Sequence, residues 1–339
     1  MSTYAHKFSV APMIDWTDRH CRFFHRRFTR RALLHTEMIT ADAVIHGDRR
    51  RLLKFHDEER PLAIQLAGAE PKKIGEAAAM AEAEGYDEIN LNIGCPSDRV
   101  QSGKFGACLM REPELVGELV AAAKTAVAIP VTVKCRLGVD EQDPDLALPA
   151  LAGAAVGAGG DAIWVHARKA WLSGLSPKQN REIPPLDYAK VIALKARFPD
   201  VFIGVNGGIA NLDQAADRLQ SVDGVMIARA AYHDPALLAE VDERFYGDRR
   251  PAETARHAVL AMLDYIDDEV AAGTRLPSIA RHMLGIFNGV PGARRWRQIM
   301  TVDAIRPGAG VETVLAALAA VTPAEPSPYA PSSAELALA

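Results

Sequence analysis

Eight short apolar stretches, several of them rich in β-branched residues, recur along the first two thirds of the chain. Most are followed by a polar or Gly/Pro turn and then by a segment with helical periodicity. Strands that are apolar on both faces lie between two layers, which is typical of a parallel sheet covered by helices. The stretches are FSVAPM (8–13), LLHTEMIT (33–40), PLAIQLAG (61–68), EINLNIG (88–94), PVTVKCRLG (130–138), AIWVHAR (162–168), VFIGVNGG (201–208) and GVMIARA (224–230).

Eight strand–helix units over about 240 residues match the number and size of a (β/α)8 TIM barrel. An open doubly wound sheet is the alternative, but the chain has no early GxGxxG, so the barrel is favoured. From Pro251 onward only helical periodicity remains, over 254–271, 277–288, 293–300 and 310–320. We therefore predict a barrel over 1–248, a small helical bundle over 249–321, and a disordered tail rich in Pro, Ser and Ala over 322–339.

Cysteine usage and hydropathy exclude several classes of protein. The four cysteines form no CxxC pair, which argues against a disulfide scaffold, an iron–sulfur cluster or a zinc ribbon, and no metal site is expected. The opening MSTYAHKFSV has no apolar signal core, and no apolar run approaches the roughly 18 residues of a membrane span. We expect a cytoplasmic protein that binds no membrane and has no obligate protein partner, most simply a monomer.

The net charge of −4 hides three basic windows that contain no acidic residue. They lie between Asp18 and Glu37, over 162–181 and over 270–302. Basic windows on an acidic chain indicate a polyanion, such as a nucleic acid, that contacts one side of the protein. Each window alone also fits a solvated surface, and the first in particular fits the exposed face of its helix.

The predicted strands end in polar residues where apolar ones would be natural in a core. In a barrel these ends form one mouth, so a ring of donors there indicates a polar or phosphorylated ligand. The ring consists of Pro12 and Met13, Gln65, Asn90 and Asn92, Lys134 and Arg136, His166 and Arg168, Asn206–Gly208, and Ala228 and Arg229.

Two of these ends predict a phosphate site. The glycines of VNGGIAN (205–211) and the IARAA segment (227–231) end strands seven and eight, where barrels of this kind bind phosphate. Glycine lets backbone N–H groups approach phosphate oxygens, and Arg229 adds a charged donor. A phosphate with a ring of donors suggests FMN, with Lys134 and His166 beside the flavin ring. A Schiff-base lysine at position 134, as in an aldolase, remains open.

Cys95 follows strand four in NLNIGCPSDRV (90–100), after a glycine and before a proline. That turn projects the thiol over the mouth, where it can transfer a proton or act as a nucleophile. Cys135 lies within a strand and is expected to face away from Lys134, as a buried apolar residue. Cys21 is expected in a helix core, and Cys108 in loop packing.

Several long motifs resemble those of the tRNA-dihydrouridine synthases, and in particular the A subfamily. The motifs are APMIDWTD (11–18), LNIGCPSDRVQSGKFGACLM (91–110), VTVKCRLG (131–138), WVHARKAWLSGLSPKQNREIPPLDY (164–188), VNGGI (205–209) and RHMLGIFNGVPGARRWR (281–297). The resemblance covers about residues 8–300 and implies NADPH-dependent, FMN-dependent reduction of uridine at positions 20 and 20a of the tRNA D-loop.

The resemblance also implies roles for single residues. Hydride would pass from the flavin to C6 of uracil while Cys95 gives a proton to C5, with Asn92 a donor to the uracil edge. The cofactor would contact Pro12, Met13, Ile14, Gln65, Lys134, His166, Asn206, Gly207, Gly208, Ala228 and Arg229. The tRNA would contact Arg136, Arg168, Lys169, Lys178, Arg181, Arg281, Arg294, Arg295 and Arg297. Trp171 and Trp296 lie among these basic residues and either stack on bases or pack within their own domain.

Other functions fit parts of the pattern. An FMN barrel that reduces a free pyrimidine explains the mouth and Cys95 but not the basic C-terminal helices. A non-catalytic RNA-binding barrel explains the basic windows and would be colourless.

Overall fold

The parallel strands form a barrel whose first and last members are hydrogen-bonded to each other. We describe residues 4–97, 103–249 and 254–321 of a computed structural model, and the tail predicted over 322–339 lies outside them. In these residues one sheet has the order β1-β8-β7-β6-β5-β4-β3-β2. A parallel bridge between Ser9 and Leu33 joins β1 to the start of β2 and closes the ring. The TIM barrel prediction is therefore confirmed.

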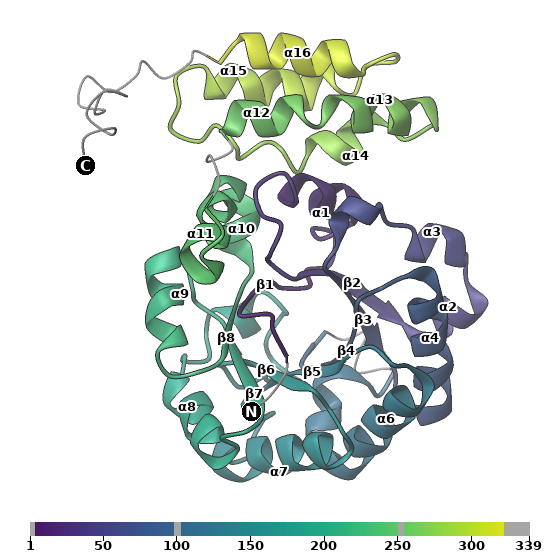
Figure 1. Cartoon of the computed structure of the whole chain (residues 1–339), viewed down its shortest axis with the longest axis vertical. Coiled ribbons are helices and arrows are strands. Elements are labelled where there is room, and N and C mark those ends of the chain that lie inside the picture. Colours follow the sequence, from purple (N-terminus) through teal and green to yellow (C-terminus); the bar gives the residue numbers. More distant parts are fainter. Residues whose placement is uncertain (1–3, 98–102, 250–253, 322–339) are drawn as a thin grey trace. The chain divides into compact units, whose positions relative to one another are not determined.

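All eight predicted strand segments are strands (Figure 1). They are β1 (Phe8–Val10), β2 (Leu34–Thr40), β3 (Leu62–Ala67), β4 (Glu88–Ile93), β5 (Val131–Arg136), β6 (Ala162–His166), β7 (Phe202–Asn206) and β8 (Gly224–Ile227). The helices of this part are α1 (Arg19–His25), α2 (Ala41–His46), α3 (Arg49–Leu53), α4 (Pro71–Glu84), α6 (Pro113–Ala126), α7 (Pro144–Gly157), α8 (Tyr188–Arg197), α9 (Leu212–Leu219), α10 (Arg229–His233) and α11 (Val241–Tyr246).

Local sequence explains where α4 begins and ends. Pro71 occupies the first turn, where its missing N–H costs nothing, and Gly85 ends the helix with a left-handed φ of 99°. Ile74, Ala77 and Ala81 recur at helical spacing and are buried.

Residues alternate along each strand between the barrel interior and the surrounding helices. The register pairs Arg136 with His166 and His166 with Asn206, so these polar residues of β5, β6 and β7 stand at one level. Deeper in the barrel, Trp164 packs with Phe202 in a fully buried cluster. Gly204 is required beside it, because a Cβ there would lie 2.2 Å from the indole. The interior is thus filled below the polar level.

The chain divides into two compact units, 1–253 and 254–339. The second contains α12 (Ala255–Leu260), α13 (Leu263–Ala271), α14 (Leu276–Ala280), α15 (Ala293–Gln298), a π-helical turn (Ile299–Asp303) and α16 (Val311–Ala319). The single helix expected over 254–271 is interrupted. There the N–H of Met262 bonds the Val259 carbonyl, three residues back, in a tighter turn, and the side chain of Met262 is buried.

In the described residues, no helix is long and apolar enough to cross a membrane.

Candidate active site

Polar side chains from neighbouring strands meet at the carboxyl end of the barrel. Nζ of Lys134 lies 3.2 Å from Oδ1 of Asn206, whose amide nitrogen donates to the Met226 carbonyl at 2.8 Å. Asn92 is paired in register with Lys134, and a Cβ at Gly207 would lie 3.2 Å from the His166 ring. The structure thus brings together the residues that the sequence predicts for strands four to seven.

Buried basic side chains dominate the electrostatics of this mouth. Burial, and then the charge of Arg136, lower the pKa of Lys134 to about 8. Burial also lowers the pKa of His166 well below its usual value, and Arg136 and Lys134 lower it further. His166 is therefore neutral at pH 7. Its Nδ1 is buried and has no hydrogen-bond partner in the part of the chain that the structure describes. A buried polar atom without a partner is costly unless a ligand or water satisfies it.

The loop after β7 begins with two consecutive glycines in a left-handed conformation. Gly207 and Gly208 have φ values of 111° and 71°, a region that favours glycine. A Cβ at Gly208 would lie 2.4 Å from a methyl carbon of Leu186 and 2.9 Å from the Tyr188 hydroxyl. That hydroxyl donates to the Gly207 carbonyl at 2.6 Å, which fixes the turn. Both conformation and space therefore require glycine here.

The turn after β8 is close to a carboxylate. Ala228 precedes the short helix α10, and the exposed Arg229 that begins it pairs with Glu182 at 2.9 Å. A phosphate bound to Arg229 would compete with that carboxylate.

Three polar backbone contacts hold the turn that carries Cys95. Oδ1 of Asn92 accepts from the N–H of Gly94 at 3.2 Å and from that of Cys95 at 3.0 Å. The Cys95 carbonyl accepts from Ala107 at 2.9 Å. A Cβ at Gly94 would lie 3.2 Å from the backbone of Cys135, so the turn passes close to β5 and another residue there would need a small shift.

The thiol of Cys95 is partly buried, with Sγ 3.5 Å from the Ser97 hydroxyl. A negative charge on it would favour the charged forms of Lys134, Arg136 and Arg181. The sulfur therefore lies near these three cationic side chains. Cys21 and Cys135 are buried as predicted, and Cys108 is partly buried.

Arg136, which is among the predicted tRNA-binding residues, is buried rather than exposed. It is 5% exposed. Its Nε donates to the Gly94 carbonyl at 3.1 Å, and Nη1 donates to the carbonyls of Lys169 at 3.2 Å and Asn180 at 2.9 Å. Arg136 therefore ties the Cys95 turn to the loop after β6. Sequence reasoning did not single out Asn180, whose side chain is fully buried and binds the backbone of Trp171.

The other basic residues of that loop differ in exposure. Arg168 is partly buried, donates to the Pro184 carbonyl, and has a buried Nε with no partner among the described residues. The Lys169 ammonium lies 5.7 Å from the centre of the Trp171 ring. Lys178 and Arg181 are exposed.

In the second unit the predicted arginines are exposed but the tryptophan is not. Arg281, Arg294, Arg295 and Arg297 all face solvent. Trp296 is fully buried, and its indole N–H donates to the Met283 carbonyl at 3.2 Å. Trp296 therefore packs within its unit and is not available to stack on a base.

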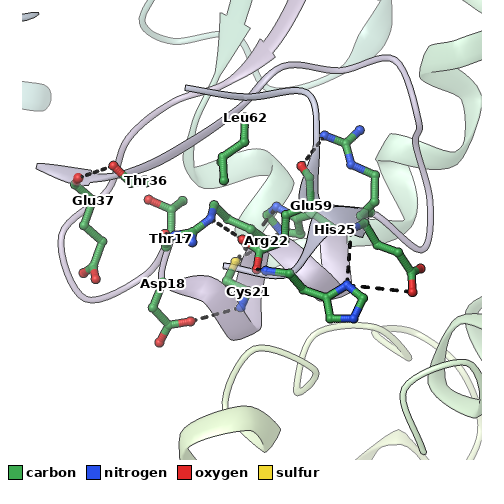
Figure 2. Close-up of polar contacts among 12 residues, drawn as sticks. Thr17, Asp18, Cys21, Arg22, His25, Thr36, Glu37, Glu59 and Leu62 are labelled. Carbon is green, nitrogen blue, oxygen red and sulfur yellow. Dashed lines mark hydrogen bonds and ion pairs between the residues drawn. The ribbon is translucent and has the colours of Figure 1, made fainter. Parts of the chain in front are cut away.

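The first basic window is largely buried, so neither an outer phosphate contact nor an exposed helix face describes it. Arg22 pairs with Glu59 at 2.7 Å and also donates to the Thr17 carbonyl (Figure 2). Arg26 donates to four backbone carbonyls, and only Arg30 and Arg31 are exposed.

The remaining predicted residues lie at the same mouth. Pro12, Met13 and Ile14 follow β1, where the N–H of Met13 bonds the Thr17 hydroxyl at 2.9 Å and Ile14 is 52% exposed. Gln65 is buried in β3 and accepts from Asn92 at 2.7 Å. An amide nitrogen carries two hydrogens, so Asn92 keeps a second donor for a substrate.

Comparison with known proteins agrees with this geometry. Residues 9–320 match the family model described as dihydrouridine synthase (Dus). The tRNA-dihydrouridine(20/20a) synthase of Vibrio cholerae is 52% identical over 94% of this chain and 98% of its own length. The protein of the same name from Escherichia coli is 50% identical over 93% of this chain and 95% of its own. The chain therefore belongs to the dihydrouridine synthase family.

Proposed function

We propose that this chain reduces the C5–C6 double bond of uridines at positions 20 and 20a of tRNA to dihydrouridine, with FMN as cofactor and NADPH as reductant. The observation that carries the proposal is the cationic mouth with Cys95 at its edge, in a chain about half identical to proteins named for this reaction. A binding protein without catalysis has no need of an acid held in that position.

The residues at the mouth fit a flavin mononucleotide. The unpartnered Nδ1 of His166 and the ammonium of Lys134 offer polar contacts to a ring with carbonyl and imide edges. The positive φ values of Gly207 and Gly208 turn the backbone sharply after β7, where a phosphate would bind, and Arg229 offers a charged donor. Pro12, Met13, Ile14, Gln65, Asn206 and Ala228 complete the set that would hold the cofactor.

The chain's own chemical contribution is the proton. When bound and reduced, the flavin supplies the hydride that reaches C6 of uracil. The Cys95 thiol gives its proton to C5, so the base gains two hydrogens and the resulting thiolate recovers a proton from solvent. Lys134, Arg136 and Arg181 lie close enough to Cys95 to interact with it electrostatically. The backbone contacts of Asn92 and Arg136 hold the thiol in place.

A base in folded tRNA must leave its stack to reach such a mouth. The proposed contacts that hold the RNA are Lys178 and Arg181 on the loop after β6, supported by Arg168 and Lys169. Further contacts come from the exposed Arg281, Arg294, Arg295 and Arg297. Phosphate contacts of this kind give affinity and salt dependence rather than base specificity.

The test is to incubate unmodified tRNA with the purified protein, FMN and NADPH, and to map uridines that gain the mass of two hydrogen atoms. Gain at positions 20 and 20a is expected, and RNA left unchanged by protein supplied with both FMN and NADPH refutes the proposal. Cys95→Ala should keep NADPH-driven flavin reduction and lose at least tenfold in RNA reduction. Cys108→Ala is the matched control and should retain RNA reduction.

A further inference from the structure

We propose that Glu88 is a positioning residue for Cys95 and acts through a one-directional chain of buried hydrogen bonds along the barrel interior. Glu88 is the first residue of β4, whereas Cys95 follows the end of that strand. The inference rests on the proton-donor role proposed for Cys95.

The chain runs through three neighbouring strands. Oε1 of Glu88 accepts from the Thr132 hydroxyl at 2.5 Å, and that hydroxyl accepts from the Asn90 amide at 2.8 Å. Oδ1 of Asn90 accepts from the Gln65 amide at 2.8 Å. Oε1 of Gln65 in turn accepts from the Asn92 amide at 2.7 Å. Oδ1 of Asn92 ends the chain by accepting from the Cys95 backbone N–H at 3.0 Å.

The sense of each bond follows from the acceptor at Glu88. Burial raises the pKa of Glu88 to about 7, so above that pH the group is a carboxylate and can only accept. A hydroxyl has one hydrogen, and Thr132 then gives it to the carboxylate, so Thr132 can only accept from Asn90. That acceptance turns the carbonyl of the Asn90 amide toward Gln65, and the same logic turns the carbonyl of Asn92 toward Cys95. If the chain ran the other way, the Asn92 amide nitrogen would face the Cys95 N–H, donor against donor.

Burial makes this direction costly to disturb. Glu88 and Gln65 are 1% exposed, and Asn90 and Thr132 are fully buried, so a broken link cannot be replaced by solvent. Barrel interiors are ordinarily filled by aliphatic side chains, so a carboxyl group at this position is unusual. No cation pairs with Glu88 in the described residues. The Tyr4 hydroxyl donates to its second oxygen at 2.6 Å, which leaves Oε1 for Thr132. A buried carboxyl group with both oxygens engaged in this way is a fixed end for the chain.

The test compares Thr132→Val, which keeps the side-chain shape and loses the hydroxyl, with Thr132→Ser, which keeps the hydroxyl. In flavin-free protein, the rate of alkylation of Cys95 by iodoacetamide is followed by peptide mass spectrometry, with Cys108 in the same sample as internal reference. Thr132→Val should raise the Cys95 rate at least threefold relative to Cys108, because the turn is no longer held, whereas Thr132→Ser should stay within twofold of wild type. Glu88→Leu, which offers no acceptor to the Thr132 hydroxyl, should resemble Thr132→Val.

A second readout uses the loaded enzyme. Thr132→Val should slow single-turnover uridine reduction about tenfold and slow NADPH-driven flavin reduction less than threefold, with Thr132→Ser near wild type in both. An unchanged Cys95 rate in Thr132→Val, equal increases in the two Thr132 variants, or equal increases at Cys95 and Cys108 would each overturn the inference. A wild-type protein that leaves tRNA unreduced would refute the proposed function instead, and the alkylation rates would still decide the inference.

Discussion

Lys134→Met should stabilise the flavin-free protein while it weakens the proposed cofactor site. Lys134 lies at the barrel mouth with Nζ 3.2 Å from Asn206, and burial lowers its pKa from 10.5 to about 8. Folding therefore places an ammonium where its charged form is disfavoured. Methionine has a similar length and no charge, so the variant removes that cost and keeps most of the packing.

The magnitude follows from the pKa. A shift from 10.5 to about 8 corresponds to about 3 kcal/mol of lost stability at pH 7, at about 1.4 kcal/mol per pKa unit. Loss of the hydrogen bond to Asn206 costs about 1 kcal/mol, so the variant should gain a net stability of about 2 kcal/mol.

The direction of the Lys134 pKa shift determines how the stability of the wild-type protein changes with pH. Because the folded pKa is the lower one, the unfolded chain binds more protons between pH 8 and 10.5. Wild-type stability therefore rises with pH in this window. The advantage of the methionine variant should accordingly shrink by about 2 kcal/mol between pH 7 and pH 9.5.

Urea unfolding of both flavin-free proteins at pH 7 and pH 9.5, followed by far-UV circular dichroism, measures this difference. FMN titration of the same samples should show at least tenfold weaker binding by the variant. A stability difference that does not change with pH, or a variant less stable at pH 7, would refute the reasoning, because an ammonium that stays solvated gives neither effect.

Three further results are expected. Gly208→Ala should weaken FMN binding at least tenfold, because φ is 71° and the new Cβ meets Leu186. Gly174→Ala, where φ is 80° and the surrounding space is open, is the control for backbone strain alone. Flavin fluorescence titration measures FMN binding by both variants. Glu59→Gln should lower the free energy of unfolding by about 3 kcal/mol in urea, because it leaves the buried Arg22 without its counter-charge, and an effect below 1 kcal/mol would contradict a desolvated pair. Arg294→Ala with Arg295→Ala should weaken tRNA binding and reduce the salt slope by about 1 per arginine, with NADPH-driven flavin reduction unchanged; an unaltered slope in filter binding would show that neither residue contacts phosphate.

The barrel was predictable because its signals are local. Strands such as β6, where residues 162–165 are all apolar and fully buried, are apolar on both faces, and only a parallel sheet between two layers buries them so. Pro71 and Gly85 mark the ends of their helix by backbone chemistry alone. The carboxyl ends of the strands then bring Lys134, His166 and Asn206 together without any further information.

The burial of several arginines could not be predicted from the sequence, because the groups that they bind lie far along the chain. Arg22 and Arg26 belong to a run that resembles a solvated basic surface. Both are nevertheless buried, because Arg22 binds Glu59 and Arg26 binds the carbonyls of Glu59 and Pro61, all more than thirty residues away. Charge composition within one window carries no information about such partners. The same holds for Arg136, whose three carbonyl acceptors lie in two loops that the sequence separates widely.

Cys95 is consequently held from two directions that differ in kind. From within the barrel, Asn92 binds the N–H groups of its turn, and from the neighbouring strand Arg136 binds the carbonyl of Gly94. Arg136 also binds Lys169 and Asn180, so a movement of the loop after β6 would pull on the same guanidinium. That loop carries the exposed Lys178 and Arg181, which we propose contact tRNA. In the proposed function, binding of the RNA and placement of the proton donor would therefore share one side chain. Arg136→Lys, which cannot span three carbonyls, should lose uridine reduction far more than flavin reduction.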